Sequence, residues 1–205
     1  RVQHDGTARL AIPPGGSAAG ALDFARRQSR WLERQLRHQI MAQQREPAWR
    51  LGTEIFFRGE LVKLQAAAEP GVSAVRFGDQ LAPVDHCATD LRLSVERRLW
   101  QLATRELTLR THELAALHGL LIHRVVVRNQ RTRWGSCSAR GVISLNWRLI
   151  QTPPWVRDYI ILHELAHLRH PNHSRRFWCA VEAACPEFER AEQWLKEHER
   201  LLVWH

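Results

Sequence analysis

Residues 160–173 read IILHELAHLRHPNH, and this stretch decides both the fold and the chemistry that the sequence predicts. His163 and His167 lie four positions apart, so on a helix their imidazoles stand one turn above each other and can reach one metal ion. Glu164 lies about 100° around the same helix, which places its carboxylate near the ion but not on it. A carboxylate in that place can take a proton from bound water, so we interpret Glu164 as a catalytic base.

The chain contains an internal control for this motif. Residues 112–116 read HELAA, so His112 lacks a second histidine four positions later and is interpreted as a surface residue. The copy at 163–167 differs because it follows a Thr-Pro-Pro helix start and lies in a strongly apolar helix, where buried polar side chains need a partner. His173 also follows it six positions later. These features favour a metal site within residues 163–173.

The third metal ligand has three candidates. His170 lies on the same helical face as His163 and His167, about 10 Å above His163 along the axis, and three rings on one straight helix converge poorly. Pro171 disfavours helical geometry at His170, so the chain turns and His173 can approach from another direction. We favour His173, with His170 second and a downstream carboxylate such as Glu182 or Glu187 third. Three histidines with an open fourth position are typical of a catalytic zinc site, so the predicted cofactor is Zn²⁺.

The segment before this helix supplies the candidate substrate-binding residues. Residues 141–147 alternate as a strand does, with Ser144 and Asn146 on one face, and such a strand could pair with an extended peptide. Asn146 is equally plausible as a structural residue that ties the strand to the helix start. Arg131, Arg133 and Ser136 could bind an oxyanion or a phosphate, or the arginines could form a solvated turn.

The remaining elements are predicted from periodicity and turn residues. A helix is expected over 17–44 with Ser17 as N-cap, strands over 54–65 and 73–77, and a helix from Thr89 to His118, closed by Gly119. Strands are expected over 122–127 and 141–147 with a loop at 128–140, and then helices over 153–169, 175–184 and 187–202. This pattern predicts an α+β fold. Residues 1–88 would form an N-terminal β-hairpin and arginine-rich helix lobe and residues 89–205 the catalytic domain, possibly as one compact unit.

Composition excludes several classes of protein. The chain has 205 residues, 44% of them hydrophobic, and no eighteen-residue apolar run, so no membrane span is expected. Its start shows no apolar run of the kind that signal peptides have. Four scattered cysteines without a CxxC pair favour a reducing, cytoplasmic location. The net charge is +9, and all basic residues except Lys63 and Lys196 are arginines, which indicates either a GC-rich genome or an attraction to polyanions such as nucleic acid or nucleotides.

Four motifs together carry a family resemblance. The segments RWGSC (133–137), GVISLN (141–146), HELAH (163–167) and HSRRFW (173–178) resemble the YgjP-like zinc metallopeptidases, which are related to the SprT and WLM groups of zincins. The resemblance implies a zincin-like core with the HExxH helix and a small antiparallel sheet, with His163, His167 and His173 as zinc ligands and Glu164 as base. The ligand spacing equals that of metzincins. However, His170 replaces their glycine, and Met41 is the only methionine, so no Met-turn follows.

The predicted function is therefore that of a zinc-dependent hydrolase. The leading hypothesis is a metallopeptidase in which Glu164 activates a zinc-bound water molecule to attack a peptide or protein substrate. One alternative is a metal-dependent nucleotide pyrophosphatase in which the arginines bind phosphates. Another is a DNA-associated protease or a zinc-stabilised nucleic-acid-binding protein, although no known DNA-binding motif is present.

Overall fold

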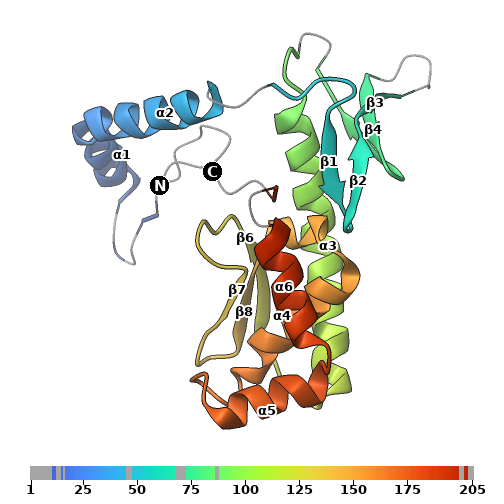
Figure 1. Cartoon of the computed structure of the whole chain (residues 1–205). Coiled ribbons are helices and arrows are strands. Elements are labelled where there is room, and N and C mark those ends of the chain that lie inside the picture. Colours follow the sequence, from blue (N-terminus) through green and yellow to red (C-terminus); the bar gives the residue numbers. More distant parts are fainter. Residues whose placement is uncertain are drawn as a thin grey trace. The chain divides into compact units, whose positions relative to one another are not determined.

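The computed structural model describes residues 11–12, 15, 17–44, 48–67, 73–85, 88–198 and 201–202 (Figure 1). Backbone contacts divide the chain into two units, Arg1–Trp49 and Arg50–His205. This grouping places the strands of residues 54–83 with the C-terminal part of the chain. The predicted domain boundary between residues 88 and 89 stays a prediction.

The first unit contains the helices α1 (Ala18–Arg27) and α2 (Ser29–Gln44). Ser17 is the N-cap, as predicted, because its Oγ accepts a hydrogen bond from the Gly20 backbone N–H at 3.1 Å. The prediction of a single helix over 17–44 is wrong at one residue, Gln28. Gln28 has φ −95° and ψ 13°, outside the helical region, and therefore separates the two helices.

Five short strands begin the second unit. The strands β1 (Glu54–Phe57) and β2 (Glu60–Lys63) form an antiparallel hairpin, and β3 (Gln65–Ala66), β4 (Ala74–Phe77) and β5 (Gln80–Pro83) form a three-stranded antiparallel sheet. The sequence analysis did not predict β5. At the β1–β2 turn, Arg58 and Gly59 both have positive φ. A Cβ atom on Gly59 would lie only 2.5 Å from Pro153, so glycine lets this turn pack against the segment before α4.

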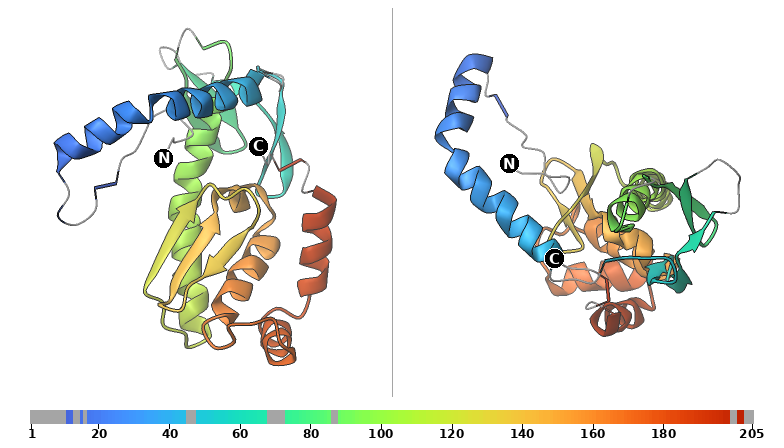
Figure 2. Two further views of the ribbon diagram at one scale, coloured as in Figure 1. Left: turned by 90° about the vertical axis from the view of Figure 1, so that its left-hand side faces the viewer. Right: turned by 90° about the horizontal axis from the view of Figure 1, so that it is seen from above.

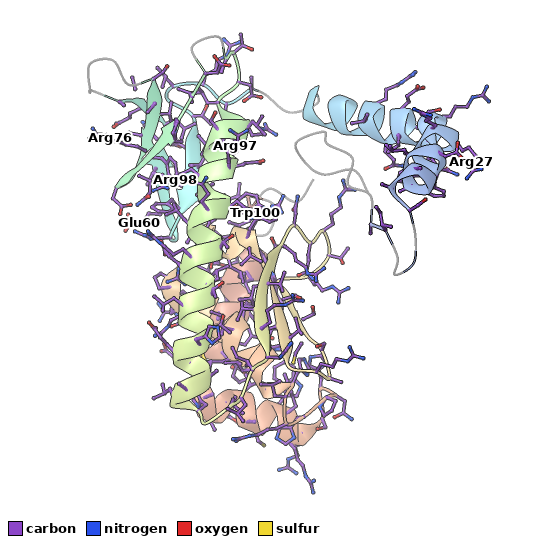
Figure 3. All side chains as sticks on the ribbon, turned by 180° about the vertical axis from the view of Figure 1, so that it is seen from behind. Arg27, Glu60, Arg76, Arg97, Arg98 and Trp100 are labelled. Carbon is purple, nitrogen blue, oxygen red and sulfur yellow. The ribbon has the colours of Figure 1, made fainter. Side chains whose placement is uncertain are left out.

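The long helix α3 spans Arg92–Leu117. Its end is as predicted, with His118 as C-cap and Gly119 at φ 61°. Its start differs from the prediction, because the helix begins three residues after Thr89. The Asp90 carboxylate accepts a hydrogen bond from the Arg92 backbone N–H. Arg98 donates to Gln80 at 2.9 Å, and Trp100 contacts Trp147 at 6.1 Å between ring centroids. Figure 3 labels Arg98 and Trp100 on α3.

The sheet of the catalytic part is mixed, not antiparallel as predicted. Its strands are β6 (Arg124–Arg128), β7 (Gly135–Cys137) and β8 (Val142–Asn146), in the order β6-β8-β7, with β6 parallel and β7 antiparallel to β8. The predicted loop over 128–140 therefore contains a strand. The segment 129–134 joins β6 and β7, which lie on opposite sides of β8, and it is fixed by hydrogen bonds from the Asn146 side chain. The chain crosses from β6 to β7 on the other side of β8 and then turns back into β8, so β6 and β8 run in the same direction.

A 3₁₀ helix, η1 (Trp147–Gln151), leads to the three C-terminal helices. These are α4 (Pro154–Ala166), α5 (Arg175–Ala184) and α6 (Phe188–His198). The bounds of α5 are as predicted, whereas α4 and α6 are shorter than expected. Helix α3 contacts β6, while α4 contacts β7, β8, α5 and α6, so α4 lies at the centre of the unit (Figures 1 and 2). Ile143, Leu145, Ile161 and Leu165 are buried in this core.

None of the helices within the described ranges combines the length and apolar character that a membrane crossing requires. The cytoplasmic location stays a prediction from the cysteine pattern.

Candidate metal centre

Three histidine side chains meet at the end of α4. His163 comes from α4, His167 is its C-cap, and His173 lies in the segment that leads to α5. One ligand nitrogen from each lies within 4.8 Å of the other two, and the Nε2 atoms of His163 and His173 are 3.1 Å apart. Two imidazole nitrogens on one tetrahedral zinc ion would be about 3.3 Å apart, given metal–nitrogen distances of about 2.0–2.1 Å. The donor set and its spacing therefore fit a zinc ion.

The chain turns immediately after α4, which is what brings His173 to the other two. The helix ends at Ala166, and the backbone N–H groups of Leu168 and His170 close a turn onto Leu165 and Ala166. Neither His170 nor the other two third-ligand candidates, Glu182 and Glu187, belongs to the group of ligand atoms found among the described residues. Of these four residues, the structure thus places His173 beside His163 and His167.

His170 acts on the site through its backbone. Its carbonyl accepts a hydrogen bond from His167 Nδ1 at 3.1 Å. A proton held on Nδ1 leaves the Nε2 atom of His167 with a free lone pair. This contact therefore selects the tautomer that can bind a cation, a role that the sequence analysis did not assign to His170.

His163 is prepared for a cation by its surroundings. Burial, together with the charges of the neighbouring His167 and His173, lowers the pKa of its imidazole to about 4. Its Nδ1 atom is buried and has no hydrogen-bond partner within the described part of the chain. Since a metal binds the neutral imidazole, these conditions favour the ligating form.

An aromatic wall from α5 supports the three rings. Phe177 is fully buried, stacks on His167 with a centroid distance of 4.5 Å, and lies 4.9 and 4.8 Å from His163 and His173. Trp178 lies 5.9 Å from both His163 and His173. The sequence analysis quoted the HSRRFW motif without assigning this role to Phe177. The feature that could have indicated this role is that both aromatic residues lie in the first turn of α5, shortly after His173.

Glu164 is held beside the cluster by packing. Its side chain is only 6% exposed, and burial raises the pKa of its carboxyl to about 7, while the positive charge of Arg133 acts in the opposite direction. A Cβ atom on Gly135 of β7 would lie 2.6 Å from both Cγ and Oε1 of Glu164. Gly135 does not have a positive φ, so a glycine is required there because the strand passes so close to the carboxylate. The sequence analysis quoted Gly135 in the RWGSC motif but did not identify this contact.

Replacing Gly135 by alanine is expected to move the Glu164 carboxylate and lower turnover about a hundredfold, because a shift of about 1 Å at a catalytic group can have that effect. Zinc content should remain at the wild-type level, since no ligand is touched. Gly20→Ala is the matched control, because Gly20 is another described glycine outside the positive-φ region and lies in α1. Wild-type turnover by Gly135→Ala would show that this close approach does not position Glu164.

The four candidate substrate-binding residues fall into two groups. Asn146 is fully buried, donates to the Gln130 and Arg133 carbonyls at 3.0 and 3.2 Å, and accepts the Arg148 N–H, so it shapes the loop before β7. Arg131 and Arg133 are exposed on that loop, and Ser136 is half-buried on β7. Helix α4 contacts β7, so Ser136 lies on a strand next to the helix that bears Glu164. Their contact with a substrate stays a prediction.

Cys137 is not part of the ligand group. It is half-buried on β7, and burial, followed by the charge of Glu164, raises the pKa of its thiol to about 11. Because a thiolate is the form that binds a metal, this thiol is poorly suited as a ligand.

Three imidazoles beside a buried carboxylate, on a core of helices and small sheets, define a metalloprotein of the metallopeptidase class. The family model described as "YgjP-like, metallopeptidase domain" matches residues 1–198, and the chain therefore belongs to the YgjP-like family. A comparison with curated proteins finds no match.

Two solved structures resemble part of the chain. One is the metallopeptidase zymogen of Pyrococcus abyssi abylysin, at 24% identity and a TM-score of 0.41, covering 47% of this chain and 99% of that one. The other is the metallopeptidase zymogen of Methanocaldococcus jannaschii jannalysin, at 20% identity and a TM-score of 0.38, covering 44% of this chain and 98% of that one.

Proposed function

We propose that the protein is a zinc-dependent peptidase in which Glu164 is the general base. The observation that carries this proposal is the convergence of three imidazole nitrogens within 4.8 Å at the end of the helix that also bears a buried carboxylate. Membership of a metallopeptidase family supports the same conclusion. The donor set supports zinc as the ion, since imidazole nitrogens at this spacing suit it.

His163, His167 and His173 would hold the ion. A zinc ion in such a site supplies Lewis acidity, which lowers the pKa of water and polarises the scissile carbonyl group. The hydrogen bond from His167 Nδ1 to the His170 carbonyl keeps one ligand ring oriented. Phe177 covers the cluster from the α5 side and restricts the rotation of all three rings.

Glu164 moves the proton. Its carboxylate would accept a proton from the attacking water molecule and later deliver it to the leaving amine. Burial brings the pKa of this carboxyl to about 7, and a base works best when its pKa lies near the operating pH. An extended peptide could pair with the free edge of β7, which is the terminal strand in the order β6-β8-β7.

We expect turnover by the zinc-loaded protein to decline as the pH falls, because only the ionised Glu164 can accept a proton. Burial sets the pKa of this carboxyl at about 7 without a metal, and a nearby cation would lower it, so the acidic limb should lie at or below about pH 7. The measurement is kcat for a peptide substrate against pH. A kcat that stays constant from about pH 8 to well below the ordinary glutamate pKa of 4.5 would exclude Glu164 as the base.

Removal of the metal, assayed with two substrates, distinguishes a peptidase from a nucleotide pyrophosphatase. We expect the zinc-loaded protein to cleave casein, a chelator to abolish this cleavage, and added zinc to restore it. The same preparations are assayed for pyrophosphate release from nucleoside triphosphates. Zinc-dependent pyrophosphate release with intact casein would contradict the peptidase and support a nucleotide pyrophosphatase.

A further inference from the structure

One part of the chain has basic residues without acidic ones. Residues 114–157 contain seven arginines and no aspartate, glutamate or lysine. Five of these arginines are exposed and belong to the strands β6–β8 and their connecting segments, and we call them the arginine surface: Arg124, Arg128, Arg131, Arg133 and Arg140.

Although the charge of Arg133 acts on the Glu164 carboxyl, the guanidinium groups of the arginine surface make no close ion pair within the described residues. None of the five makes an ion pair or a side-chain hydrogen bond there. Three arginines elsewhere in the same unit are paired: Arg58 with Glu106 at 2.8 Å, Arg110 with Asp158 at 2.8 Å, and Arg157 with Glu106 at 3.3 Å. Single exposed arginines elsewhere, such as Arg76 and Arg105, also lack an ion pair within the described residues, so the distinguishing feature of residues 114–157 is the gathering of such arginines in a stretch without any acidic residue.

A buried arginine adds to this charge. Arg148 is 2% exposed, donates to the Asn129 side chain at 2.6 Å, and has its guanidinium 4.7 Å from the Trp147 ring centroid. Burial lowers the pKa of Arg148 to about 10, the negative charge of Glu96 acts in the opposite direction, and the charge of Arg131 on the adjoining loop again lowers this pKa. The exposed segment that carries Arg131 and Arg133 therefore lies near a buried arginine, Arg148.

Two residues of the arginine surface, Arg131 and Arg133, lie on the segment that leads into β7 and so toward the candidate metal centre. Arg133 lies two residues before Gly135, and the backbone of Gly135 approaches Glu164 so closely that a Cβ atom there would meet its carboxylate at 2.6 Å. Strand β7, which begins at Gly135, contacts α4. A ligand that extends from the centre along β7 toward its start therefore reaches Arg133 and then Arg131.

From this placement we infer that the arginine surface binds acidic side chains of the polypeptide substrate on one side of the cleaved bond. The inference rests on the proposed peptidase function. A guanidinium group matches a carboxylate with two parallel hydrogen bonds, and free arginines hold such partners without displacing an internal one. Nucleic acid is less favoured, because single strands are bound through aromatic stacking, and Trp134 and Trp147 are half-buried and buried.

The test measures peptide binding to the zinc-loaded full chain with Glu164→Gln, which prevents cleavage. Two labelled peptides are used that differ only in carrying glutamates or glutamines. We expect the glutamate peptide to bind about tenfold more tightly at low salt, as a few exposed ion pairs provide, and this preference to decline as salt is added. In Arg131→Glu/Arg133→Glu the preference should disappear while the glutamine peptide binds as before.

The matched control is Arg76→Glu/Arg105→Glu. It changes the net charge equally but alters exposed arginines on β4 and α3 (Arg76 is labelled in Figure 3), and it should keep the preference. Equal binding of the two peptides by the chain with intact arginines would overturn the inference. Tighter binding of a single-stranded DNA with the same number of charges would also overturn it, in favour of a nucleic-acid partner. A further outcome is that the glutamate peptide binds through the arginines but the wild type cleaves neither peptide. This result would support binding of acidic side chains by the arginine surface and contradict the proposed peptidase function.

Discussion

Replacing Glu164 by glutamine is expected to lower turnover by about two to four orders of magnitude, the range typical of a general acid–base group. Glutamine has nearly the same shape, so the packing against Gly135 should persist, but its amide cannot accept the proton of the attacking water molecule. The three imidazoles are unchanged, so the zinc content should remain at the wild-type value. The measurements are kcat on a peptide substrate and zinc per chain.

The chain provides a matched control for this substitution. Glu113 follows His112 in the HELAA segment, is exposed on α3 and pairs with Arg110 at 2.9 Å. Glu113→Gln should therefore leave turnover within about twofold of wild type, since exposed ion pairs contribute little. If Glu164→Gln retains a similar turnover, the base has been assigned to the wrong residue.

Replacing His173 by alanine is expected to lower zinc affinity by more than about a hundredfold. Loss of a direct ligand should exceed the 10–100-fold losses that follow changes to outer hydrogen-bond partners. The remaining imidazoles, His163 and His167, would leave the ion with two protein ligands. Zinc affinity is measured by competition with a chromogenic chelator, and peptide cleavage should decline in parallel.

His170→Ala is the control, because His170 contributes its backbone carbonyl and its ring is not in the ligand group. Zinc affinity in this variant should stay close to that of the wild type. The opposite order, in which His170→Ala loses zinc and His173→Ala retains it, would show that the third ligand is His170.

Much of the candidate site could be predicted because it depends on local geometry. His163, Glu164 and His167 share one helix, so their spacing alone determines which faces they occupy. The choice of His173 required only the helix-terminating effect of Pro171. The end of α4 at Ala166 was less predictable, because residues 167–169 continue the helix as a turn and have no stop residue of their own.

Contacts between distant segments could not be predicted. Strand β7 has small residues, Gly135, Ser136 and Cys137, without the β-branched pattern that identifies β6, so it was interpreted as part of a loop. Its pairing with β8 makes the sheet mixed and brings Gly135 against Glu164, and both depend on how the segment 129–134 returns. Helix caps show the same contrast, because Ser17 and Gly119 act locally as predicted, whereas Asp90 accepts the hydrogen bond expected of Thr89.

Elemental analysis of protein purified without chelator tests whether His163, His167 and His173 hold one metal ion. We predict one zinc per chain in the wild type, close to none in His163→Ala, and an unchanged value in His112→Ala, whose histidine is exposed on α3. A wild-type protein without a stoichiometric metal, even after incubation with zinc, would contradict the account.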